Sequence, residues 1–251
     1  MQDSKERFSA KVADYVKYRP TYPETALAHL CGKTGVKESS EIADIGSGTG
    51  KFTKLLLDKN LQVFGVEPNK NMRDAAEIEL SEYPNFQSIN GSAEATTLKD
   101  NSVDLITVAQ AFHWFDRDKC MPEFRRILKN GGKVALIWNT RDKSSGFMAQ
   151  CEEILKCYST DPPNFAHEMI TEEVFAEIFK THETTDFRWT QSFDVEAFLG
   201  RVASSSYSPL PTHENYEPQK KALCELFEKY QKNGKVEYEY QTKLIIGEMG
   251  E

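Results

Sequence analysis

The sequence predicts an α/β fold with a doubly wound, mostly parallel sheet and helices on both faces. Three observations lead to this class. Short apolar runs typical of buried strands alternate with segments of helical periodicity, a glycine-rich turn follows the first run, and an acidic residue ends the second. With 251 residues, the chain is long enough for one large domain with a substantial core.

The expected strands alternate with helices along the chain. The first strand ends just before Gly46, and the others cover residues 61–66, 86–90, 103–109, 133–138, 182–193 and 235–248. Helices are expected after the glycine-rich turn and over residues 147–158, 171–180, 194–207 and 214–232. A further helix around Met121 is expected to stop at Asn130-Gly131-Gly132. An amphipathic segment over residues 8–23 precedes them all.

Right-handed crossovers would place the carboxyl ends of these strands along one edge of the sheet, where open α/β folds bind their ligands. The residues expected at that edge are Gly46, Glu67, Ser92, Gln110 and Asn139. The helices after the fifth strand and between the last two are expected to cover it.

The turn Gly46-Ser47-Gly48-Thr49-Gly50 is the most specific local motif. Glycine lets the backbone turn tightly and leaves no Cβ between the main chain and a ligand. The dinucleotide fingerprint G-x-G-x-x-G fails at Lys51, and the phosphate-binding P-loop fails at Ile45 and Phe52. Glu67 follows the turn by about 20 residues, a separation at which a carboxylate can accept hydrogen bonds from ribose hydroxyls. The turn and the acid therefore fit a ligand that contains a ribose, and neither the dinucleotide motif nor the P-loop motif is complete.

Composition favours small-molecule partners. The formal net charge of −8 argues against a general affinity for nucleic acid or an anionic membrane. The five cysteines are scattered along the chain without a C-x-x-C pair, so no metal site is expected. We expect the cysteines to be reduced and to pack in the protein interior. Asp161-Pro162-Pro163-Asn164 nearly matches a motif of enzymes that methylate the amino groups of nucleic-acid bases. It does not follow the fourth strand, so we interpret it as a loop. With no signal peptide or membrane-spanning run in the sequence, a cytoplasmic protein without stable membrane association is expected.

Six segments resemble a known family. They are residues 44–50, residues 65–69 with Met72, residues 91–94, Asp104, residues 109–115 and residues 128–132. Together they resemble the type 11 small-molecule methyltransferases, a group that includes trans-aconitate and quinone-pathway enzymes. The resemblance implies a class I, Rossmann-like methyltransferase that uses S-adenosylmethionine (SAM), with seven strands and the last one antiparallel. Ser92 is a departure, because members often carry Asp beside the adenine.

The resemblance also implies roles for individual residues. The expected cofactor-binding residues are Tyr18, Arg19, Asp44, Gly46, Ser47, Gly48, Glu67, Pro68, Met72, Ser92, Ala93, Glu94 and Gln110. Arg19 would pair with the SAM carboxylate, and Met72 either flanks the adenine or only packs. The expected substrate-binding residues are Tyr22, Trp114, Trp138, Arg141 and Arg201, of which the arginines could hold an acid group. His113 is either a general base or a packing residue beside Trp114.

The expected organisation is a single methyltransferase domain over residues 1–251. Within it, residues 1–35 form a helical lid, 36–140 the cofactor-binding core, 141–234 the substrate-covering helices with the sixth strand, and 235–251 the closing strand. The expected reaction is methyl transfer to a small molecule, with oxygen, including carboxylate oxygen, favoured. The alternatives are C-methylation of a quinone-like or sterol-like substrate, and a regulator that binds SAM without catalysis. The sequence does not determine the oligomeric state.

Overall fold

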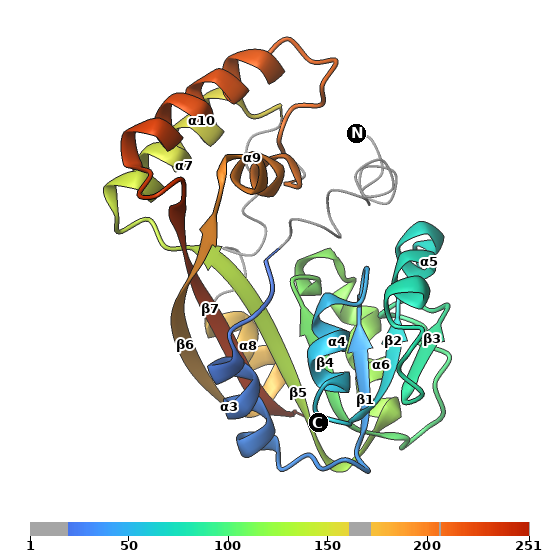
Figure 1. Cartoon of the computed structure of the whole chain (residues 1–251). Coiled ribbons are helices and arrows are strands. Elements are labelled where there is room, and N and C mark those ends of the chain that lie inside the picture. Colours follow the sequence, from blue (N-terminus) through green and yellow to red (C-terminus); the bar gives the residue numbers. More distant parts are fainter. Residues whose placement is uncertain (1–19, 161–171, 206, 251) are drawn as a thin grey trace. The chain divides into compact units, whose positions relative to one another are not determined.

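A computed structural model describes residues 20–160, 172–205 and 207–250 (Figure 1). Two sequence-based features lie wholly or partly outside these residues: the first 19 residues of the expected helical lid (1–35), and the loop that begins at Asp161. The described chain separates into two compact units. The larger unit comprises residues 21–138, 172–187 and 242–250, and the smaller unit comprises Pro20 and residues 139–160, 188–205 and 207–241.

The sheet has seven strands in the order β3-β2-β1-β4-β5-β7-β6. They are β1 (Glu41–Ile45), β2 (Gln62–Val66), β3 (Phe86–Ile89), β4 (Val103–Ala109), β5 (Leu128–Arg141), β6 (Phe179–Phe193) and β7 (Val236–Met249). The pairs β1–β2, β1–β4, β2–β3 and β4–β5 are parallel, with Ala43 opposite both Phe64 and Ile106. The predicted α/β class with a mostly parallel sheet is confirmed.

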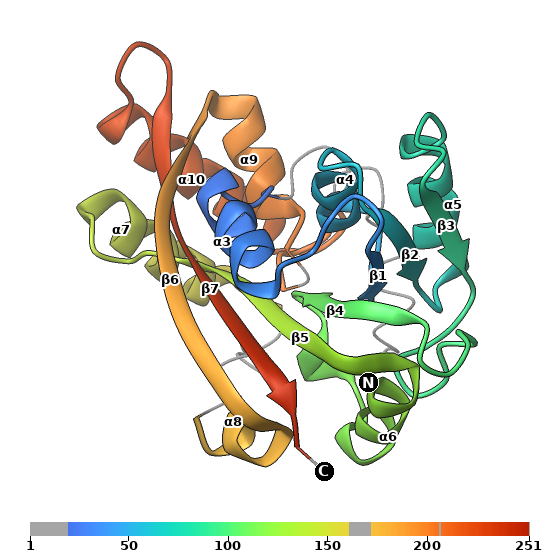
Figure 2. The same cartoon turned by 90° about the horizontal axis from the view of Figure 1, so that it is seen from below.

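Helices cover both faces of the sheet in the larger unit. Figure 2 shows α3 (Glu24–Thr34), α4 (Lys51–Leu57) and α5 (Lys70–Glu79) on one face and α6 (Arg117–Ile127) and α8 (Glu172–Ile178) on the other. A short 3₁₀ turn, η1 (Phe112–Trp114), follows β4. Ile42 packs in the cluster with the first set of helices, and Ala43 packs in the cluster with the second. This alternation along β1 is the two-residue period of a strand buried on both faces.

The smaller unit contains α7 (Gly146–Tyr158), α9 (Val195–Ala203) and α10 (Tyr216–Tyr230). Helices α7 and α10 lie side by side (Figure 1). Their apolar faces pack with Phe198 of α9 and Tyr238 of β7 in one cluster. The Asp142 N–H donates to the Glu239 carbonyl (3.0 Å) and the Thr140 hydroxyl to the Gln241 carbonyl (3.2 Å). From Thr140 to Asp142 at the end of β5, the partner in β7 moves back from Gln241 to Glu239, so these ends of the two strands run antiparallel.

Several expected boundaries were wrong. Helix α6 ends at Ile127, and β5 begins at Leu128 instead of residue 133. Leu128 pairs with Val103 and Lys133 with Leu105, so the glycine pair forms an irregularity inside the strand, where Gly131 has a φ of 80°. A glycine signal for a helix end is equally a signal for a bulge. Similarly, residues 179 and 180 belong to β6 and not to the preceding helix, and α9 ends at Ala203 instead of residue 207.

Candidate cofactor and substrate sites

The three glycines after β1 all have left-handed backbones, with φ of 71°, 58° and 81° at Gly46, Gly48 and Gly50. A Cβ added at Gly46 would lie 2.6 Å from the Ala111 Cβ, and one at Gly50 would lie 2.7 Å from the Leu80 Cδ1. A Cβ added at Gly48 would meet no atom within 4 Å. Packing against Ala111 therefore requires glycine at position 46, and the left-handed backbone favours it at position 50. Gly48 leaves its main chain open to a ligand.

Glu67, at the end of β2, meets this loop. Its carboxylate accepts hydrogen bonds from the Gly48 N–H (3.0 Å) and the Asn69 N–H (2.8 Å). The Arg73 guanidinium donates to the carbonyls of Glu67 and Pro68, both at 2.8 Å, which holds the main chain on either side of the acid.

Asp44 lies beneath the loop with 1% of its surface exposed. Its carboxylate accepts from the Thr53 hydroxyl of α4 (2.6 Å) and the Thr107 hydroxyl of β4 (2.9 Å). Burial raises the pKa of Asp44 to about 6, although these two hydrogen bonds act to lower it. Both oxygens are engaged inside the protein, so the geometry gives Asp44 a positioning role. Its expected direct contact with the cofactor stays a prediction.

The segment after β3 carries the residues expected near the adenine. Ser92 and Ala95 exchange backbone hydrogen bonds of 3.1 and 3.2 Å, which closes a tight turn around Ala93 and Glu94. The Glu94 carboxylate accepts from the Asp116 N–H (3.0 Å) at the start of α6. On the neighbouring helix α5, Met72 is buried.

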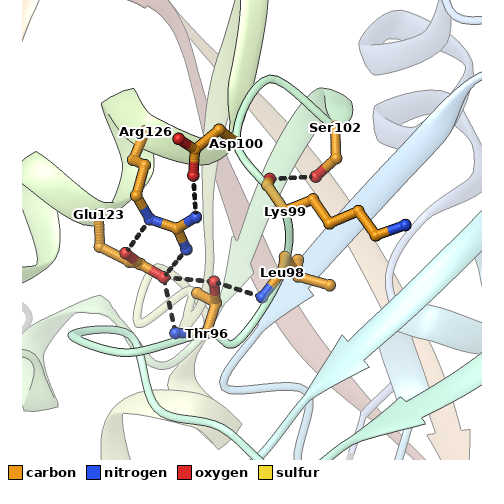
Figure 3. Close-up of polar contacts among 7 residues, drawn as sticks. All are labelled: Thr96, Leu98, Lys99, Asp100, Ser102, Glu123 and Arg126. Atoms are coloured by element: carbon orange, nitrogen blue, oxygen red, sulfur yellow. Dashed lines mark hydrogen bonds and ion pairs between the residues drawn. The ribbon is translucent and has the colours of Figure 1, made fainter.

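A carboxylate–guanidinium clamp, made of Glu123 and Arg126 on α6, holds this segment (Figure 3). Glu123 accepts from the Thr96 N–H (2.8 Å) and hydroxyl (2.5 Å), and Arg126 donates to Glu123 at 2.7 and 2.8 Å. Arg126 also binds Asp100 at 2.5 Å. The hydrogen bonds from Arg126 are the main reason that the pKa of Glu123 is lowered to about 2. Sequence reasoning missed this clamp, because no local pattern links Thr96 to a residue 27 positions away.

The segment after β4 approaches from the other side of β1. Gln110 has a φ of 60°, which is uncommon for a residue with a side chain and is typical of functional turns. Its N–H donates to the Ile137 carbonyl at 2.9 Å. The His113 and Trp114 rings lie 4.8 Å apart, and Trp114 is 47% exposed.

Trp138, at the end of the larger unit's portion of β5, is buried with its ring edge-on to Phe112 (6.4 Å). In the part of the chain that the structure describes, its indole N–H has no hydrogen-bond partner. Tyr22 packs edge-on against Phe52 at 5.0 Å and is 8% exposed. Tyr18 and Arg19 lie outside the described residues.

The structure thus gathers the described cofactor candidates at the ends of the parallel strands of the larger unit. It places Arg141 and Arg201 in the smaller unit, where Arg141 pairs with Glu152 (2.8 Å) and Arg201 donates to the Tyr240 hydroxyl (2.8 Å). Across the three described ranges, no group of three or more His, Cys, Asp or Glu side chains is placed to hold a metal ion. Nor does any helix described there have the length and apolar character that crossing a bilayer requires.

A seven-stranded sheet of this order, with a glycine loop after β1 that meets an acid at the end of β2, defines a class I methyltransferase. Residues 43–136 match the family model described as a methyltransferase domain. The chain is 35% identical over 200 residues to an uncharacterised methyltransferase of Mycobacterium tuberculosis, covering 80% of this chain and 76% of the relative. It is 32% identical over 214 residues to one of Schizosaccharomyces pombe, covering 82% of each.

Among solved structures, a putative type II methyltransferase from Anaeromyxobacter dehalogenans superposes with a TM-score of 0.71 and 22% identity, covering 92% of this chain and 98% of that one. This likeness supports the fold. The chain belongs to the type 11 family of SAM-dependent methyltransferases.

Proposed function

We propose that this methyltransferase transfers the methyl group of SAM to a small-molecule acceptor, preferentially at oxygen. The observation that carries the cofactor assignment is the meeting of Gly48 and Glu67. A Cβ added at Gly48 would meet open space, and the Gly48 N–H donates to the Glu67 carboxylate at 3.0 Å. This arrangement suits a nucleoside that carries no phosphate.

In this proposal Gly46, Ser47 and Gly48 pass beneath the amino acid end and the ribose, and Glu67 accepts from the ribose hydroxyls. The adenine lies between Pro68 and Met72. The residues proposed to complete the cofactor site are Ser92, Ala93, Glu94 and Gln110, with Tyr18 and Arg19 from the N-terminal segment. The Ala93 N–H faces the adenine, the Gln110 carbonyl accepts from the ammonium, and Arg19 pairs with the carboxylate. SAM has no phosphate, which agrees with the failed P-loop pattern.

When bound, SAM supplies a methyl carbon already activated by its positive sulfur. The chain's own residues therefore orient the acceptor and exclude water, rather than supplying covalent chemistry. Trp114 and Trp138 are proposed as apolar walls of the acceptor site. An acceptor that is already ionised, such as a carboxylate, needs no base, whereas a hydroxyl or carbon acid would need one. His113 is the candidate for that role.

Small-molecule acceptors are favoured over nucleic acid by charge. Binding of nucleic acid depends on neutralising phosphates with Lys and Arg, whereas this chain carries 31 such residues against 39 acidic ones. We therefore expect no salt-sensitive binding to oligonucleotides at near-physiological ionic strength, and a mobility-shift titration measures this.

The experiment that tests the proposal measures S-adenosylhomocysteine (SAH) release from SAM with a metabolite extract as the acceptor pool. Mass spectrometry then identifies the methylated product. Glu67→Ala is the test variant, and Glu79→Ala is its control, because Glu79 is exposed and forms an ion pair with Lys54 away from the loop. A methyl ester or ether product lost in Glu67→Ala alone supports the proposal. A C-methylated product would overturn the oxygen assignment, and SAM binding without SAH release from any fraction would favour the regulator.

A further inference from the structure

The sheet ends in a long edge strand. Strand β6 is the last in the strand order, with β7 as its one neighbour among the described strands. It has 15 residues, whereas strands in globular proteins usually have about 5–6. An edge strand presents a row of main-chain N–H and C=O groups that can pair with a strand of another chain. The outer edge of β6 is therefore a candidate interaction surface.

Strand β6 lacks the backbone features that usually prevent such pairing. Residues 179–193 include no proline, and none of the positive-φ residues of the described chain lies among them. Proline and bulges are two common protections of an edge, and charged side chains are a third. The strand does carry charges, at Lys180, Glu183, Asp186 and Arg188. Since these charges have both signs, their order decides which partner strand fits.

The residues around Phe187 are complementary to themselves. When two copies of β6 run antiparallel about a twofold axis at Phe187, Asp186 lies opposite Arg188 of the partner subunit, and Thr184 lies opposite Thr190 of the partner subunit. The two Phe187 rings face each other at the axis. Opposite charges, paired threonines and paired aromatic rings are cross-strand neighbours that stabilise a sheet. An axis at Asp186 or at Arg188 would instead place two like charges directly opposite each other.

The four polar side chains of this pattern share one face of β6. Successive side chains of a strand point to opposite faces, and the side chains at 184, 186, 188 and 190 are all exposed. They belong to one short stretch of a single strand, so their spacing does not depend on how the two units are placed. Phe187 points to the other face, where its ring lies edge-on to His29 of α3 at 5.5 Å.

Arg188 is able to contact a partner chain without losing a strong interaction. Its side chain is 76% exposed, and its Nε lies 3.3 Å from the Asp142 carboxylate. An ion pair at the protein surface contributes little to stability, and a guanidinium has five N–H donors. Arg188 can therefore bind a second carboxylate, or exchange one for the other, at little cost.

We infer that the outer edge of β6 binds a second copy of this chain, through antiparallel pairing centred on Phe187 that joins two sheets into one. Both copies use the same edge, so the assembly closes as a dimer. An extended peptide of another protein would need its own matching charges, whereas the order of Asp186 and Arg188 matches itself. Strands β4, β5 and β7 separate β6 from β1 in the sheet, so the glycine loop after β1 takes no part in the pairing.

The test measures the mass of the full chain by sedimentation velocity, from micromolar to several hundred micromolar concentration. The test variants are Asp186→Arg, Arg188→Asp and the double variant that exchanges the two charges. Glu77→Arg is the control, because it makes the same change of charge as Asp186→Arg at an exposed position of α5. Amide hydrogen exchange at low and high protein concentration locates the interface. Thermal unfolding and SAH titration check that each variant is folded.

The expected result is a reversible dimer for the parent protein and for Glu77→Arg. Each single variant replaces two opposite-charge pairs by two like-charge pairs, so its dimer Kd should rise at least about 10-fold. The double variant restores the opposite pairs and should dimerise as the parent does. Amides of β6 should exchange more slowly at the concentration where the dimer forms. SAH affinity should be the same in all variants.

A parent protein that stays monomeric over the whole range would overturn the inference. So would a dimer that neither single variant weakens, or one whose slowed amides lie outside β6. Weakening in both single variants without recovery in the double variant would refute the pairing about Phe187, and equal weakening in Glu77→Arg would show a general effect of charge instead. If one single variant does not fold, the other single variant and the double variant decide the result.

Discussion

Substitution of Gly48 gives a direct test of the candidate cofactor site, because a matched glycine exists elsewhere. Gly48 has a φ of 58° and Gly131, in the irregular part of β5, has a φ of 80°. At neither position would an added Cβ meet an atom within 4 Å. Alanine at either position costs a similar backbone strain, about 1–2 kcal/mol for the left-handed region. The pair therefore separates the effect of strain from the effect of filling the ligand's path.

In Gly48→Ala, the new methyl group stands between the loop and the ligand, and crowding of this kind costs about 1–3 kcal/mol. SAH affinity should fall about 5- to 150-fold. The branched side chain of Gly48→Val should abolish measurable binding, while Gly131→Ala should bind as the parent protein does. Isothermal titration measures the affinities, and thermal unfolding checks that the two alanine variants lose similar stability. SAH binding of equal strength in all three variants would refute the assignment of this loop.

The remaining predictions concern single ionisable groups. Glu67→Ala should weaken SAH binding by about 1.5–3 kcal/mol, the range for a hydrogen bond to a charged group; an unchanged Kd would remove Glu67 from the site. Asp44 has a pKa of about 6 in the folded protein against 3.8 when unfolded, so the folded state retains its proton over that interval. Ionisation of Asp44 should therefore lower the free energy of unfolding by about 3 kcal/mol as the pH rises from about 4 to about 6. Urea denaturation of Asp44→Asn should lack this fall, and parallel pH profiles for the two proteins would contradict it. The pKa of Glu123 is lowered from 4.5 to about 2, so its stabilisation is present above pH 4.5 and is lost as the pH falls toward 2. Glu123→Gln should flatten this acid limb and also weaken SAH binding, because the segment from Ser92 to Leu98 loses its anchor; intact SAH affinity would show that the clamp does not serve the site. If the acceptor is an ionised carboxylate, His113→Ala should lower kcat only modestly and leave the pH profile flat, whereas a loss of about 10²–10⁴-fold would indicate a general base and a hydroxyl or carbon acceptor.

The sequence by itself determined the features that short segments encode. A mostly apolar run marked the strand Val103–Ala109, because burial on both faces of a parallel sheet favours continuous apolar character. The glycine loop and the acid that follows it about 20 residues later were also readable, since a crossover of fixed length returns the chain to the same edge of the sheet. The fold class and the family follow from these local signals.

Only the tertiary structure decided which distant side chains meet. Thr107 binds Asp44 because β1 and β4 are neighbours in a register that no spacing along the chain reveals. The same is true of Glu123 and Thr96. The glycine pair before Lys133 could end a helix or interrupt a strand, and pairing of Leu128 with Val103 decided for the strand. The sequence marked Arg201 as a candidate for holding an acid group, but it did not predict that this side chain is buried. Its burial without an acid partner in the described chain depends on the packing of α9 against β7, because electrostatic balance inside a protein is a property of contacts in space and not of the order of residues.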